Sequence, residues 1–147
     1  MRFSRAFTVI ELIFVIVILG VLAAVSLPKF ADTKKHADIA KGRSYIADIR
    51  ASIVNERQSR VLLGDVSYIS KLSPSNSSTT LFTGDGAGKD LLTYGMKKGS
   101  ASGEWNIVND TTYTYNVNGV STTFTYDPAN GTFTCTQDTG ECNALVD

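Results

Sequence analysis

The residue with the clearest chemical significance is Glu11, which places a carboxylate inside a long run of apolar side chains. The run covers residues 7–27, and its polar members are Thr8, Glu11 and Ser26. An ionised carboxylate inside a bilayer costs about 2.5 to 3.5 kcal/mol on insertion scales and marks a functional site by default. Glu11 therefore needs a partner that offsets this cost, and we predict a functional role for it.

A pair of cysteines near the C-terminus is the second chemical signal. Cys135 and Cys142 lie seven positions apart. In an exported domain such a pair favours a disulfide that closes a small loop and contributes about 2 to 3 kcal/mol. A metal site would need two further ligands, and the single histidine, His36, is distant in the sequence. We therefore prefer a disulfide to a metal site.

Other chemistries have weaker support. No acid/base dyad and no nucleophile with an adjacent base emerges, so we predict that the chain is not an enzyme. Residues 84–89, GDGAGK, are followed by Asp90 and lack the spacing and hydroxyl of a phosphate-binding loop. Asp127, Asp138 and Glu141 could gather around a calcium ion, but an acidic surface explains them as well. We expect no cofactor, with calcium as the one candidate.

Charge is balanced overall and uneven along the chain of 147 residues, which has 14 basic and 14 acidic side chains. Residues 29–60 hold eight Lys or Arg and four Asp or Glu, whereas residues 99–147 hold six acidic side chains and no basic one. The two regions could attract each other between identical subunits, or both could be solvated surfaces. An acidic C-terminal region gives no electrostatic footprint for nucleic acid.

The element that positions Glu11 is a predicted membrane and assembly helix over residues 7–28, of which residues 7–27 are the apolar run. A helix over residues 7–27 would be about 31 Å long, which matches the hydrocarbon core of a bilayer. Arg2 and Arg5 precede it. By the positive-inside rule these arginines keep the N-terminus cytoplasmic and send the C-terminal part outward, although the basic residues after Pro28 compete with this assignment.

Beyond Pro28 the pattern becomes amphipathic. One face of a helix over residues 29–63 carries four isoleucines at spacings of seven, three and four: Ile39, Ile46, Ile49 and Ile53. This stripe is expected to pack on a sheet of the same subunit. Gly64 and Asp65 should end the helix.

The remainder divides into a variable loop region, residues 64–103, and an antiparallel sheet of about four strands in residues 104–147. The loop region is rich in Ser, Thr, Gly and Asn, which favours a functional or poorly ordered surface. The sheet region is rich in Thr, Tyr, Phe and Val. Asn118 and Gly119 are typical of a two-residue hairpin turn.

These features resemble the N-terminus of the type IV pilin and type II secretion pseudopilin family. The resemblance covers residues 6 to about 30: a short basic leader, the small residue Ala6, the segment FTVIEL, the apolar run and the closing Pro28. It implies that a prepilin peptidase removes residues 1–6 and methylates the new N-terminus at Phe7. Ala6 is a departure, since the family most often has glycine there. Glu11 would then be the fifth residue of the mature chain.

The resemblance also implies roles in assembly. Phe7, Thr8 and Glu11 would form the assembly site, in which Glu11 of one subunit meets the α-amino group of Phe7 in a neighbour. Gly20 and Pro28 would allow the helix to unwind in a filament. The cysteine pair resembles, in miniature, the C-terminal disulfide loop of type IV pilins.

The expected fold is thus α+β and pilin-like, with a long N-terminal helix packed on a small antiparallel sheet. The expected function is that of a structural subunit, made in the bacterial inner membrane with its C-terminal domain in the periplasm. Its expected partners are other pilin subunits, the peptidase, the inner-membrane assembly platform and membrane lipid. A pilus, a secretion pseudopilus and a competence fibre remain open, for a major or a minor subunit. The alternative is a membrane-anchored binding module that does not polymerise.

Overall fold

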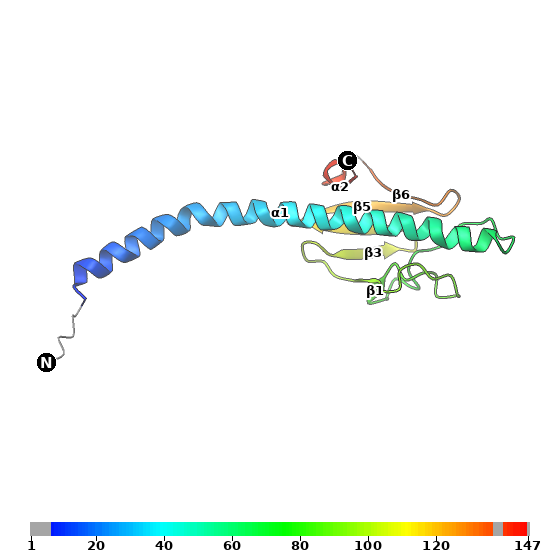
Figure 1. Cartoon of the computed structure of the whole chain (residues 1–147), viewed down its shortest axis with the longest axis horizontal. Coiled ribbons are helices and arrows are strands. Elements are labelled where there is room, and N and C mark those ends of the chain that lie inside the picture. The colour runs from blue at the N-terminus through cyan, green and yellow to red at the C-terminus, as the bar shows by residue number, and fades with distance from the viewer. Residues whose placement is uncertain (1–6, 137–139, 147) are drawn as a thin grey trace. The chain divides into compact units, whose positions relative to one another are not determined.

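The computed structural model describes residues 7–136 and 140–146, and a long N-terminal helix is its largest element (Figure 1). Helix α1 spans Val9–Val61, 53 residues without interruption. The chain forms two compact units, residues 1–35 and residues 36–147. Helix α1 contributes to both units, and each is described here by itself. The expected continuation of the helix through Pro28 is confirmed.

The C-terminal end of α1 is closed by a glycine in the left-handed region. Gly64 has a φ of +90°. Its N–H donates to the carbonyl of Val61 at 3.0 Å, and the N–H of Asp65 donates to the carbonyl of Arg60 at 3.1 Å. This pair of bonds is a Schellman motif, which satisfies carbonyls that the last helical turn leaves open. The predicted stop at Gly64 and Asp65 is confirmed.

A four-stranded antiparallel sheet follows in the second unit, with its strands in sequential order. The strands are β3 (Trp105–Asn109), β4 (Thr112–Val117), β5 (Val120–Asp127) and β6 (Thr132–Cys135). Asn118 and Gly119 connect β4 to β5 with φ values of 50° and 86°. Both residues are left-handed, as a type I′ hairpin turn requires. The predicted hairpin is confirmed.

The core lies between one face of this sheet and the C-terminal part of α1, which runs along it in Figure 1. Burial alternates along the strands, so every second side chain points inward. From the helix, Ile46, Ile49 and Ile53 are buried, and Ile39 is partly buried. The sheet contributes mostly aromatic side chains: Trp105, Tyr113, Tyr115, Phe124, Tyr126 and Phe133. The expected α+β fold, with a long helix on a four-stranded sheet, is confirmed.

Residues 64–103 are more than a surface loop, contrary to the expectation from their composition. They contain two short paired strands, β1 (Thr80–Leu81) and β2 (Met96–Lys97). They also bury five large apolar side chains in the same core: Ile69, Leu72, Leu81, Phe82 and Met96. The Phe82 ring lies 5.3 Å from that of Trp105, edge to face. These apolar residues are too widely spaced in a polar segment to show any periodicity, which is why the pattern did not predict their burial.

Residues 98 and 99 lie beside β3. Lys98 and Trp105 form a parallel bridge. The N–H of Gly99 donates to the carbonyl of Trp105 at 2.8 Å. This contact ties the second half of the 64–103 segment to the sheet.

Gly42 sets how closely α1 approaches the sheet and the C-terminal segment. A Cβ at this position would lie 2.6 Å from Tyr115 and 2.6 Å from Leu145. Such distances are sub-van-der-Waals, so only glycine fits without displacement of its neighbours. The Tyr115 hydroxyl also donates to the carbonyl of Asp38 at 2.7 Å. The glycine that weakens the helix by propensity therefore supports its packing.

Candidate functional site

The start of α1 is organised by Thr8 and Glu11. Thr8 precedes the first helical residue, Val9, and is therefore the N-cap. The N–H of Glu11 donates to the Thr8 hydroxyl oxygen at 3.3 Å and to the Thr8 carbonyl at 3.1 Å. Thr8 and Glu11 have the T-x-x-E spacing of a capping box. Their side chains thus share one helical turn, with the carboxylate at the positive end of the helix dipole.

The apolar segment that surrounds Glu11 is not buried against any other part of the chain that the structure describes. An 18-residue window in α1 has a mean hydropathy of 2.9, and none of it is buried. The large apolar side chains in residues 7–25 are between 41% and 75% exposed. By length and composition this segment is able to cross a membrane. The exposed apolar surface is much larger than that of an ordinary soluble monomer.

Phe7 and Gly20, two further residues of the predicted assembly region, lie in open surroundings. Phe7 is 74% exposed, and Ala6 lies outside the described residues. In the unprocessed chain the Phe7 nitrogen belongs to a peptide bond, so the predicted amine arises only after cleavage. A Cβ on Gly20 would meet no atom within 4 Å. The helix is regular through both Gly20 and Pro28, which are the positions predicted to unwind in a filament.

The two cysteines form a disulfide, as predicted. Cys135 ends β6, and Cys142 begins the short helix α2 (Cys142–Val146), with their Cα atoms 5.9 Å apart. Cys142 and Leu145 are buried. The N–H of Glu141 donates to the hydroxyl of Thr122 in β5 at 2.8 Å. The disulfide and this hydrogen bond together fasten the short helix α2 to the sheet.

A row of arginines also holds the second unit together, and the sequence analysis did not identify it. Arg43, Arg50 and Arg57 recur every seven residues on α1. Each donates its Nε–H to a backbone carbonyl: Ala144 at 2.7 Å, Phe133 at 3.0 Å and Val66 at 3.1 Å, respectively. The heptad spacing was the available signal, because residues seven apart lie on one side of a helix. We call these three residues the arginine row.

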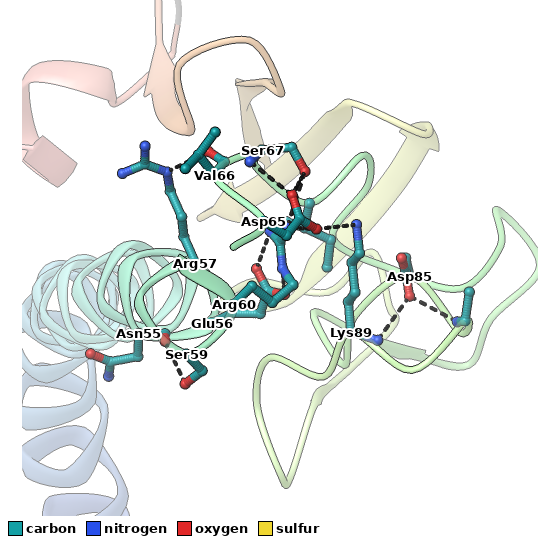
Figure 2. A network of polar contacts seen from close by, with 12 residues as sticks. Asn55, Glu56, Arg57, Ser59, Arg60, Asp65, Val66, Ser67, Asp85 and Lys89 are labelled. Carbon is teal, nitrogen blue, oxygen red and sulfur yellow. Dashed lines mark hydrogen bonds and ion pairs between the residues drawn. The ribbon is translucent and has the colours of Figure 1, made fainter. Parts of the chain in front are cut away.

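A further polar network surrounds the end of α1 (Figure 2). Arg60 forms a two-pronged ion pair with Glu56, and its Nη1 lies 2.7 Å from a carboxylate oxygen of Asp65. The Ser67 hydroxyl and N–H donate to the other oxygen of Asp65 at 2.7 and 3.0 Å. The two hydrogen bonds from Ser67 are the largest cause that lowers the pKa of Asp65, and the hydrogen bond from Arg60 is the next largest. The bond to Glu56 raises the pKa of Arg60. The guanidinium of Arg60 thus joins the last turns of α1 to the loop that follows the helix.

No group of three or more His, Cys, Asp or Glu is placed to hold a metal ion in residues 7–136 and 140–146. Asp127 ends β5, whereas Glu141 contacts Thr122 near the other end of that strand. Asp138 lies outside the described residues. Burial raises the pKa of Tyr113 to about 12.

Comparison with known proteins gives one partial match. The chain is 36% identical over 58 residues to a fimbrial protein of Moraxella nonliquefaciens. The match spans 40% of this chain and 38% of that protein, so it covers about two fifths of the curated relative. No family model matches the chain, and no solved structure matches it.

Proposed function

We propose that the chain is a structural subunit of a type IV pilus-like or type II secretion pseudopilus filament. The observation that carries the proposal is the exposed apolar half of α1 with Glu11 in its first turn. A surface of this kind needs lipid or other helices as its surroundings. The partial similarity to a fimbrial protein and the α+β fold support the same conclusion.

In this proposal the apolar segment has two successive environments. It first anchors the unprocessed chain in the inner membrane, with the sheet domain on the periplasmic side. A prepilin peptidase then cleaves between Ala6 and Phe7 and methylates the Phe7 nitrogen. An inner-membrane assembly platform finally transfers the subunit into a filament, where the apolar segments bury one another.

Glu11 is proposed to set the register of assembly. Its carboxylate pairs with the Phe7 α-amino group of a neighbouring subunit, which offsets the cost of a charge in apolar surroundings. The cap at Thr8 fixes the first turn and so limits where the carboxylate can reach. A subunit shifted along the helix axis would leave both charges unpaired.

The test is filament recovery from the native host with Glu11→Ala, Glu11→Gln and Thr8→Ala. We expect both Glu11 variants to be cleaved normally and to lose most filaments, since each lacks the carboxylate. Thr8→Ala keeps the carboxylate but removes the cap, so we expect a smaller loss of filaments, which separates the contribution of the charge from that of helix capping. Filaments of normal yield from processed Glu11→Ala would refute the register role. A wild-type chain that is anchored and processed but never recovered in filaments would favour the alternative, a membrane-anchored binding module.

A further inference from the structure

The first unit carries a group of lysines directly after its apolar segment. The apolar run ends at Leu27 and is followed by Pro28. The lysines that come next are Lys29, Lys34 and Lys35. Lys29 and Lys34 are exposed, and Lys35 is partly exposed. Asp32 lies among them, so the local charge is three minus one, or +2. We call the three lysines the lysine girdle.

The girdle surrounds the helix. At about 100° per residue, Lys34 lies about 140° around the axis from Lys29, and Lys35 lies about 100° beyond Lys34. The three side chains therefore point in directions that are nearly evenly spaced. A protein partner on one side of the helix could reach one or two of them, whereas a lipid layer that surrounds the helix meets all three.

The axial position of the girdle fits the headgroup layer. Residues 9–26 form about 27 Å of helix, close to the thickness of about 30 Å of the hydrocarbon core. The girdle then extends over about 9 Å along the axis, close to the 5 to 8 Å of the polar headgroup layer on each side. Phe30, within the girdle, is 73% exposed and is the only aromatic side chain there.

A shallow groove of about 200 Å³ lies at the same level, lined by Ser26, Lys29, Phe30 and Thr33. The hydroxyl of Ser26 donates to the carbonyl of Leu22 at 2.8 Å, and that of Thr33 donates to the carbonyl of Lys29 at 2.9 Å. Both hydroxyl protons are thus used within the helix. The ammonium of Lys29 is the donor that this groove presents to a ligand, which selects an anionic group.

We propose that the lysine girdle binds the phosphate groups of anionic phospholipids in the periplasmic leaflet of the inner membrane. This inference rests on the proposed function, because it requires the anchored state of the subunit. Lysines on the exported side oppose the positive-inside rule, and contact with anionic headgroups offsets that disadvantage. The girdle holds the unassembled subunit at a fixed depth, with the apolar segment level with the acyl chains.

The experiment measures which lipid lies next to the girdle. The full chain with Phe30→Trp is reconstituted into vesicles of phosphatidylcholine and phosphatidylglycerol. All vesicles have the same ratio of the two lipids. In one set the acyl chains of phosphatidylglycerol carry bromine near the headgroup, and in the other set those of phosphatidylcholine do. Bromine quenches tryptophan on contact. The native Trp105 is 1% exposed inside the second unit, so it supplies a constant background.

We expect brominated phosphatidylglycerol to quench the introduced tryptophan more strongly than brominated phosphatidylcholine. An attraction of the usual size gives about a fivefold local enrichment for each lysine near the surface. Changing all three lysines to Gln should reduce the enrichment at least about tenfold. Changing all three to Arg should preserve it, since the charge is kept.

A matched control removes three lysines from the second unit, with Lys71→Gln, Lys97→Gln and Lys98→Gln, and should leave the enrichment unchanged. Equal quenching by the two brominated lipids in the parent chain would overturn the proposal, as would enrichment that persists in the Gln variant. Equal quenching together with oligomers that the Gln changes dissociate would assign the girdle to a second copy of the chain. Absence of quenching by either lipid would mean that the chain is not inserted, which would contradict the proposed function itself.

Discussion

The two parts of α1 use basic residues in different ways. In the second unit the arginine row, Arg43, Arg50 and Arg57, donates to backbone carbonyls far along the chain. Among the described residues of the first unit the cations are three lysines, and two of these are exposed. A guanidinium is planar and donates in fixed directions, whereas an ammonium is a strongly hydrated point charge on a flexible stem. One half of the helix is therefore built for folding, and the other is left for surroundings outside the subunit.

The apolar residues make the same contrast. Ile49 is completely buried, whereas Ile16 on the same helix is 56% exposed. A helix that is apolar on all sides needs an apolar medium, while an amphipathic one needs a single partner surface. Three pairs of matched changes would show whether the two halves of α1 are energetically independent.

The largest effect is expected for Ile49→Ala, which removes a fully buried side chain from the core. The free energy of unfolding of the second unit should fall by about 2 to 5 kcal/mol. The matched change Ile16→Ala in the first unit should leave it unaltered. Thermal unfolding of the full chain in detergent, followed by Trp105 fluorescence, measures both. An equal loss of stability for Ile16→Ala would show that the halves fold as one unit.

The second comparison uses two glycines of α1. Gly42→Ala forces a methyl group against Tyr115 and Leu145, and overpacking should destabilise the second unit by about 1 to 3 kcal/mol. Gly20→Ala adds the same methyl group in open space, where it only favours the helix. The midpoint of chemical unfolding, read from Trp105, distinguishes them. Unchanged stability in Gly42→Ala would mean that the contact at this position can relax.

The third comparison concerns the cations. Arg50→Gln removes the donor to the carbonyl of Phe133, and the lost hydrogen bond should cost about 0.5 to 1.5 kcal/mol. Lys34→Gln removes a cation from the first unit and should not change the stability of the second. Both are read from urea unfolding of the full chain. If Arg50→Lys restores full stability, the charge rather than the directed Nε–H is responsible.

The smallest effect is expected for Asp65, whose carboxylate is 45% exposed. Its pKa is lowered in the folded state, so the carboxylate favours folding above the ordinary value of about 3.9, and this contribution is lost as the pH falls below it. Asp65→Asn should therefore lower the melting temperature near neutral pH, with a difference that narrows under acid conditions. Melting curves of both proteins across this range test the sign. A difference that widens in acid would contradict the assignment.

The parts of the fold that follow a repeating pattern could be predicted from the sequence. The isoleucine stripe, the alternating strands and the Asn118-Gly119 turn depend on local geometry, and the structure confirms each of them. The disulfide was also predicted, because a nearby cysteine pair has few competing uses. The cleavage at Ala6 and Phe7 and the role of Glu11 in assembly stay predictions, since they concern events outside a single folded subunit.

The unpredicted features depend on contacts between residues distant in the sequence. The packing role of Gly42 could not be predicted, because it comes from Tyr115 and Leu145, which lie 73 and 103 positions later. Leu81 and Phe82 lie in a polar segment and are buried because the sheet and the helix leave space for them. The arginine row was not predicted for the same reason: its carbonyl partners are set by the tertiary fold.

The bond from Arg50 to the Phe133 carbonyl has a consequence for solubility. Phe133 lies on the outermost strand of the sheet, β6, and its occupied carbonyl is not available to a strand from another molecule. At the opposite border, residues 98 and 99 cover part of β3. Uncovered sheet borders recruit further strands and promote aggregation. Under the proposed function, these two contacts oppose association between the sheets of different copies and leave the exposed apolar half of α1 as the surface through which copies meet.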